Sequence, residues 1–168
     1  MTMKTNVQKH QYADLKPADF DKFDCVKISP IIYIALMYLL KAYLVWIVTV
    51  TNMQDRASII QFFYPDKWVF FVNLASGAIG ILAVIVLTLR RPDAANWVKW
   101  LWHRYSLLIV FALIFDFTVN VVAVLLWGIG HFQWVLATSI IAVLITICLY
   151  KSKRVKINLQ EFPEKLPE

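Results

Sequence analysis

The sequence contains little of what catalysis or a disulfide framework requires. Its 168 residues include two cysteines, Cys25 and Cys148, and neither belongs to a CxxC pair. Two cysteines in this arrangement predict free thiols rather than a disulfide framework or a cysteine-based metal site. The chain also lacks an HExxH motif, a glycine-rich phosphate-binding loop and a nucleophile that is spaced from a base as in a known catalytic motif. We therefore predict that the protein has no catalytic residues and is not an enzyme.

Histidine is equally scarce, and its three copies are His10, His103 and His131. His103 and His131 flank an apolar run at its opposite ends, so they are too far apart to bind one metal ion or one haem. Hydrogen bonding at the membrane surface is the role we expect for both. The sequence therefore predicts no metal site and no cofactor.

Charged residues are also few, at 17% of the chain, whereas hydrophobic residues make up 60%. Soluble domains contain about 25% charged and about 45–50% apolar residues, so this composition is typical of a membrane protein. Four apolar runs are long enough to cross a hydrocarbon core of about 30 Å as helices. The first run is too long for the apolar segment of a cleaved signal peptide. The four runs cover residues 29–50, 68–89, 105–128 and 131–150.

These runs predict an all-α polytopic membrane protein with four transmembrane helices and short interfacial helices. The predicted transmembrane domain covers residues 29–150, between a cytoplasmic lead-in at 1–28 and a cytoplasmic tail at 151–168. The loop at 51–67 is rich in aromatic and aliphatic residues, which predicts a short interfacial helix that stops before Pro65. A re-entrant path for this loop remains the alternative.

The loop at 90–104 predicts a second interfacial helix. Pro92 and Asp93 are typical of a helix start, with Asp93 as the N-cap. Trp97, Trp100 and Trp102 follow, and tryptophans beside a span are typical of the aromatic belt at the membrane surface. We therefore expect this helix to lie at the level of the lipid headgroups.

Basic residues are unevenly distributed around the four runs. Of the 17 Lys and Arg residues, 14 lie before the first run, between the second and third runs, or after the fourth. Two lie in the loop at 51–67, and the last is Lys41. Because cytoplasmic segments carry the excess of Lys and Arg, both termini are predicted to be cytoplasmic. The same bias accounts for the net charge of +6, so we expect no nucleic-acid partner.

Two charges stand in the middle of apolar runs. Lys41 lies at the centre of the first run and Asp116 at the centre of the third, with Asn120 one turn further on. A charge at the bilayer centre costs about 2.5–3.5 kcal/mol, so such residues usually face the bundle interior and pair. We predict a salt bridge between Lys41 and Asp116 near the midplane, with Asn120 or Asn73 completing its hydrogen bonds.

Three interpretations of these two charges remain open. In the first, the pair only fixes the register of the helices. In the second, Lys41 and Asp116 take part in proton or ion movement. In the third, Lys41 reaches outward to the headgroups, or either charge pairs with another subunit.

The second run carries a stripe of small residues. Ser76, Gly77 and Gly80 follow Asn73 at spacings of three and four, which places them on one helix face. Small side chains on one stripe let two helix backbones approach closely. The stripe therefore predicts a helix-packing face, and a gap lined for a ligand is the alternative.

Two stretches resemble a known family. The segment ADLKPADFDKFDCVKISP at 13–30 precedes a helix in which Lys41 stands before Tyr43 and Trp46, and FFYPD at 62–66 precedes the second run. In these features the chain resembles the YfeZ-like bacterial inner-membrane proteins, a family of unknown function. The resemblance implies a small four-span protein in the inner membrane of Gram-negative bacteria, and it implies no activity.

Two functional hypotheses follow. The first is a non-enzymatic accessory or structural membrane protein that packs against a larger membrane complex. The second is a small transporter or channel subunit that works as a homo-oligomer and uses the Lys41–Asp116 pair. Both hypotheses require that the protein is embedded in a lipid bilayer.

Overall fold

Every secondary-structure element named in the described part of the chain is a helix. The computed structural model describes residues 19–21, 23, 25–52, 56–64, 67–127 and 132–163. An isolated antiparallel bridge between Phe20 and Val26 is the other regular pairing within these ranges. The all-α prediction is therefore confirmed. The helices are α2 (Pro30–Leu39), α3 (Lys41–Thr51), α4 (Arg56–Phe63), α5 (Lys67–Thr88), α6 (Asn96–His103), α7 (Tyr105–Trp127), α8 (Phe132–Lys151) and α9 (Lys153–Gln160).

The structure contains two to four candidate membrane spans. Helices α5 and α7 are each long and apolar enough to cross a bilayer. Helices α2 and α3 meet at a bend of 64°, and Val135–Lys151 of α8 meets α9 at a bend of 69°. The number of candidate spans rises to four if each bent pair counts as one span.

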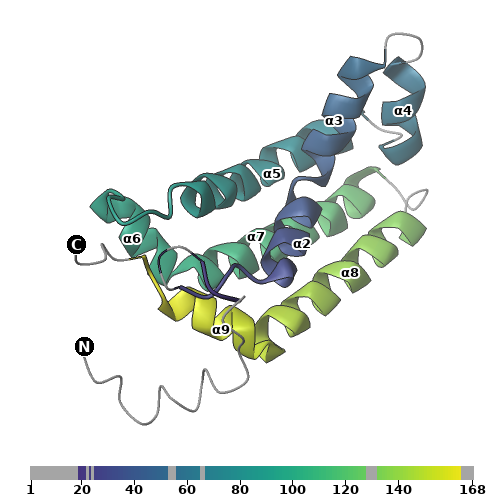
Figure 1. The fold of residues 1–168 in the computed structure, drawn as a ribbon. Helices are drawn as coiled ribbons and strands as arrows, with labels where there is room; N and C mark the ends of the chain where they lie inside the picture. The colour runs from purple at the N-terminus through teal and green to yellow at the C-terminus, as the bar shows by residue number, and fades with distance from the viewer. Residues whose placement is uncertain are drawn as a thin grey trace, which may run out of the picture.

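The long helices lie side by side, and the bent α2–α3 pair packs against them (Figure 1). Helix α4 lies at one end of this bundle, whereas α6 and α9 lie at the other end (Figure 1). The link between α7 and α8, where two predicted spans meet at 128–131, is outside the described residues. The buried core joins α2, α5, α7 and α8 through Ile32, Leu36, Leu39, Ala83, Val86, Ile109, Leu113 and Ile145.

The first predicted span, 29–50, is not one straight helix. It bends between Leu39 and Lys41, and neither proline nor glycine stands at the bend. The helical hydrogen bonds continue on both sides, because Leu40 N–H donates to the Leu36 oxygen at 2.9 Å and Leu44 N–H donates to the Leu40 oxygen at 2.9 Å. Kinks without a local helix breaker need another cause. We attribute this one to the contacts that the bend makes with α5 and α7.

Helix α5 approaches the bend through its two glycines. A Cβ added to Gly77 would stand 2.9 Å from the Tyr43 ring and 3.1 Å from the Leu39 carbonyl oxygen. A Cβ added to Gly80 would stand 3.0 Å from the Leu39 Cβ. The stripe of small residues therefore lies against α2 and α3, and side chains larger than glycine would force the bend away from α5.

Helix α6, which the sequence predicted as an interfacial helix, differs from its prediction in two respects. It begins at Asn96 with Ala95 as N-cap, so the prediction that Asp93 caps it is wrong. A turn occupies the predicted start, since Ala94 N–H donates to the Arg91 oxygen at 3.0 Å. The second difference concerns Trp102, which is 0% exposed and therefore belongs to the core rather than to an aromatic belt.

Helical spacing explains why Trp102 is buried while the other two tryptophans of α6 are exposed. Val98 and Trp102 are four residues apart and share the buried face of α6, whereas Trp97 and Trp100 are exposed. The Trp102 ring stacks on Tyr105 with 4.8 Å between the ring centroids. Its Nε1–H donates to the Glu161 carbonyl oxygen at 2.9 Å.

The segment predicted as a tail is packed into the fold as far as the description extends. Asn158 of α9 is fully buried. Its Oδ1 accepts a hydrogen bond from Ser29 N–H at 2.9 Å, and its Nδ2 donates to the Val26 oxygen at 2.8 Å. The Glu161 carboxylate accepts from Val26 N–H at 2.7 Å. The residues before α2 and after α8 therefore hold each other in place through buried polar contacts.

Candidate functional site

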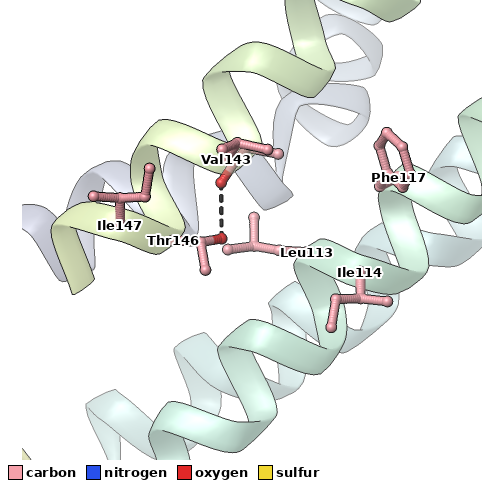
Figure 2. Close-up of a pocket in the computed structure, with 7 residues that line it drawn as sticks. Leu113, Ile114, Phe117, Val143, Thr146 and Ile147 are labelled. Atoms are coloured by element: carbon pink, nitrogen blue, oxygen red, sulfur yellow. Dashed lines mark hydrogen bonds between the residues drawn. The ribbon is translucent and has the colours of Figure 1, made fainter. Parts of the chain in front are cut away.

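Two places in the bundle qualify as candidate sites, and the first is an apolar groove between α7 and α8. The groove has a volume of about 270 Å³. Leu113 and Phe117 line it from α7, and Val143 and Thr146 line it from α8 (Figure 2). The Thr146 hydroxyl donates to the Ala142 carbonyl oxygen at 2.8 Å, so it is already engaged within its own helix. This groove offers an apolar surface and no charged group.

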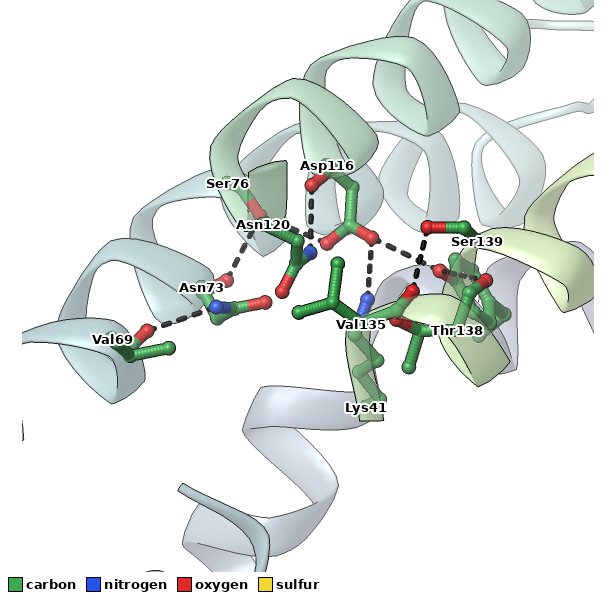
Figure 3. Close-up of polar contacts among 10 residues, drawn as sticks. Lys41, Val69, Asn73, Ser76, Asp116, Asn120, Val135, Thr138 and Ser139 are labelled. Atoms are coloured by element: carbon green, nitrogen blue, oxygen red, sulfur yellow. Dashed lines mark hydrogen bonds and ion pairs between the residues drawn. The ribbon is translucent and has the colours of Figure 1, made fainter. Parts of the chain in front are cut away.

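The second place is the polar cluster in the middle of the bundle, where the two predicted charges meet. Lys41 is the first residue of α3, directly after the bend, and Asp116 is the twelfth of the 23 residues of α7. Lys41 Nζ lies 2.5 Å from Asp116 Oδ2 (Figure 3). The side chain of Asp116 is 4% exposed and that of Lys41 is 18% exposed. The structure therefore joins the two residues in one largely buried ion pair.

Tyr38 adds a third group to the pair from α2. Its hydroxyl lies 3.1 Å from Asp116 Oδ2 and 3.0 Å from the Thr138 carbonyl oxygen, so one proton is shared between two acceptors. The Lys41 ammonium also lies over the Tyr38 ring, 4.2 Å from its centroid. A cation over an aromatic face is stabilised by the ring quadrupole, more strongly where water is excluded. Tyr38 thus contacts both charges and links α8 to them.

Ser76 contacts the other carboxylate oxygen from α5. Its Oγ lies 3.3 Å from Asp116 Oδ1 and 3.1 Å from the Asn73 carbonyl oxygen. Its single proton is again divided between two acceptors. Gly77 and Gly80 do not enter the polar cluster, because they face the bend between α2 and α3. Within the predicted stripe, Ser76 therefore has a polar contact and the two glycines have a packing role.

The two asparagines do not complete the hydrogen bonds of the carboxylate, so that part of the prediction is wrong. Asn120 Nδ2 donates to the main-chain oxygen of Asp116 at 2.7 Å, and Asn73 Nδ2 donates to the Val69 oxygen at 2.9 Å (Figure 3). Each is a bond to the residue four positions earlier in the same helix. A short amide side chain reaches this carbonyl without any help from a neighbouring helix.

Asn73 leaves one acceptor without a partner. The residue is 2% exposed, and its Oδ1 makes no hydrogen bond within the described part of the chain. Reversing the amide would not help, because Oδ1 would then face the Val69 carbonyl oxygen. A buried amide oxygen without a donor costs free energy, which makes Asn73 a weak point of α5.

The sequence signals for the polar contacts of Tyr38 and of Ser76, which was predicted only as a packing residue, were present but weak. Tyr38 stands three residues before Lys41, and Ser76 stands three residues after Asn73, so each lies one turn from a residue already singled out. Tyr64, which precedes α5, is a buried residue that responds to the charge of Asp116. Burial, followed by the negative charge of Asp116, raises the pKa of Tyr64 well above its usual value. The Tyr64 hydroxyl therefore keeps its proton.

The two cysteines and His103 do not belong to the polar cluster. Cys25 is buried and Cys148 is exposed, and neither forms a disulfide within the described residues, which agrees with the prediction. His103 Nδ1 lies 2.9 Å from the Lys99 oxygen, within its own helix turn. Among the described residues, no group of three or more His, Cys, Asp or Glu side chains is placed to hold a metal ion.

Comparison with known proteins places the chain in a family without assigning an activity. A family model described as "Protein of unknown function (DUF2919)" matches residues 15–161, so the chain belongs to this family. No curated protein and no solved structure matches the chain. The match ends at Glu161, and so it includes α9 and its contacts with the residues before α2. The chain is thus a helical membrane protein of a family of unknown function.

Proposed function

We propose that this DUF2919 protein is a non-enzymatic accessory or structural component of a membrane, built to present a fixed helical surface to a larger membrane complex. The ion pair carries the proposal. Lys41 and Asp116 contact each other at 2.5 Å, and Tyr38 and Ser76 occupy further positions around the carboxylate. These contacts tie α2, α3, α5 and α7 together and favour a role for the pair in holding one arrangement.

The proposed location is the bacterial inner membrane with both termini in the cytoplasm. The resemblance to inner-membrane proteins supports the compartment, and the distribution of Lys and Arg supports the orientation. Labelling of single cysteines with a membrane-impermeant maleimide tests the orientation. In a Cys148→Ser background, we expect Thr51→Cys to react in intact spheroplasts, because Thr51 is exposed at the far end of α3.

Lys153→Cys is the matched position for the opposite side. It is exposed at the start of α9 and should react only after the spheroplasts are opened. Labelling of both positions from the same side would contradict the proposed orientation and a crossing by α2 and α3.

Native mass spectrometry of the protein, extracted gently from its own membrane, tests the accessory role. A stable complex with an unlike membrane protein is the expected result, and that partner would define the process served. A homo-oligomer without an unlike partner would contradict the accessory role and favour the second candidate. A lone monomer would contradict both and leave the ion pair as architecture.

The second candidate is a transporter or channel subunit, and the helix break is the observation that favours it. Discontinuous helices with charged groups near the midplane are typical of ion and substrate sites in transporters. Here the break adjoins Lys41, which contacts Asp116. In this case Asp116→Asn would abolish ion or proton flux in liposomes, and Thr118→Val, on the exposed side of the same helix, would leave it unchanged.

A further inference from the structure

A second groove lies outside the polar cluster, where the chain leaves α5 and enters α6. It has a volume of about 290 Å³ and is lined by Leu89, Arg91, Asp93 and Trp97, among others. Arg91 is exposed, and its side chain makes no hydrogen bond or ion pair within the described residues. Trp97 is 49% exposed. The groove thus combines an available guanidinium, an indole and an aliphatic side chain at the end of a candidate span.

The segment that forms the groove and continues through α6 is basic, because residues 89–104 contain four Lys and Arg residues and one acidic residue. Lys99 and Arg104 belong to α6 or directly follow it, and Arg104 lies over the Trp100 ring at 4.3 Å from its centroid. Helix α9 lies at the same end of the bundle and carries further basic residues (Figure 1). Asp93 is the acidic group among the residues that line the groove. A guanidinium in such surroundings matches the geometry and charge of a phosphate.

An apolar path leads from this groove along α5. Leu82, Ile85 and Leu89 are 40–41% exposed. Their spacings of three and four place them on one face of the chain as it leaves α5. Leu89 also lines the groove, so the exposed face and the groove are continuous. A molecule with a phosphate head and a long hydrocarbon chain fits both parts at once.

We infer that the groove between α5 and α6 is a binding site for an anionic phospholipid. The lipid phosphate contacts Arg91, the headgroup lies against Trp97, and an acyl chain follows the face formed by Leu82, Ile85 and Leu89. Trp97 suits this level of the membrane, because its ring is apolar while its N–H remains able to donate to the headgroup. The site would bind a specific lipid, and this inference does not depend on the proposed accessory role.

Native mass spectrometry of the full chain in a neutral detergent, with phosphatidylglycerol added at fixed ratios, tests the site. We expect one tightly retained phosphatidylglycerol per protein and a higher melting temperature in its presence. Arg91→Gln should weaken retention about five-fold, since it removes one basic residue at an anionic surface. Trp97→Leu, which removes the indole N–H and keeps an apolar side chain, should weaken it as well.

Lys67→Gln is the matched control, because Lys67 is an exposed basic residue at the opposite end of α5. It should retain phosphatidylglycerol as the unmodified chain does. Equal retention by Arg91→Gln and the unmodified chain would overturn the site. Equal retention of phosphatidylcholine or phosphatidylethanolamine would overturn the selectivity for anionic lipid. Melting curves without lipid identify any variant that fails to fold. If Arg91→Gln fails to fold, Arg91→Lys, which keeps the charge, replaces it. Arg91→Lys should retain more lipid than Trp97→Leu.

Discussion

Removal of Lys41 alone should destabilise the bundle far more than removal of both partners of the Lys41–Asp116 pair. The Asp116 side chain is 4% exposed, so Lys41→Met would leave a carboxylate in the core with only the hydroxyls of Tyr38 and Ser76. Breaking a buried pair in this way costs about 3–5 kcal/mol. In the double variant Lys41→Met/Asp116→Asn no charge remains, and we expect a cost of about 1–2 kcal/mol or less.

The two single variants should also differ from each other. Asp116→Asn leaves the Lys41 ammonium, whose side chain is 18% exposed and lies over the Tyr38 ring. A long flexible stem lets the ammonium move toward a more polar environment. The expected cost is therefore that of a hydrogen bond to a charged group, about 1.5–3 kcal/mol.

Reversible unfolding in mixed micelles, followed by tryptophan fluorescence as the fraction of denaturing detergent rises, measures all four proteins. The coupling free energy from this double-mutant cycle should be about 2 kcal/mol or more. If the two single costs add up in the double variant, the pair does not stabilise the fold. A larger cost for Asp116→Asn than for Lys41→Met would refute the argument from exposure.

Three further substitutions test other contacts by the same assay. Gly77→Ala should destabilise by about 1–3 kcal/mol, because its Cβ would stand 3.1 Å from the Leu39 carbonyl oxygen; an unchanged midpoint would mean that the bend moves freely. Asn158→Ala should cost about 1–3 kcal/mol, since it leaves the Ser29 N–H unpaired in the core; a neutral effect would show that the hydrogen bonds of Asn158 do not stabilise the fold. Asn73→Leu should be neutral or stabilising by about 1 kcal/mol, because it removes an unpartnered buried oxygen; a large loss would imply an undetected partner.

The sequence alone predicts the features of the fold that depend on composition and periodicity. Apolar runs of sufficient length predicted helices α5 and α7. Opposite charges at the centres of two runs predicted the partners of the ion pair. Spacings of three and four gave the stripe through which Gly77 and Gly80 meet another helix. Each of these predictions uses one element at a time, or one depth in the membrane, and needs no knowledge of how the helices are arranged.

The features that the sequence did not predict depend on contacts between distant segments. The bend at Leu40 has no proline or glycine to mark it. The burial of Trp102 requires a partner for its N–H, and that partner is the Glu161 carbonyl oxygen beyond α9. Asn158 appears in a polar segment that reads as a tail, yet its amide completes the backbone hydrogen bonds of residues before α2. In each case a tertiary contact overrides what the local sequence favours.

The bend also bears on how α2 and α3 relate to the bilayer. Helices of 10 and 11 residues are about 15 Å and about 16 Å long at 1.5 Å per residue. Joined at 64°, they reach about 27 Å from end to end, a few ångströms less than a hydrocarbon core of about 30 Å. The pair is therefore long enough for one crossing with slight local thinning. If the pair is one span, its break falls halfway through, at the level of Asp116 in the middle of α7 and Ser76 near the middle of α5. A bend at this depth directs Lys41 toward the carboxylate, so the ion pair and the break belong to one arrangement.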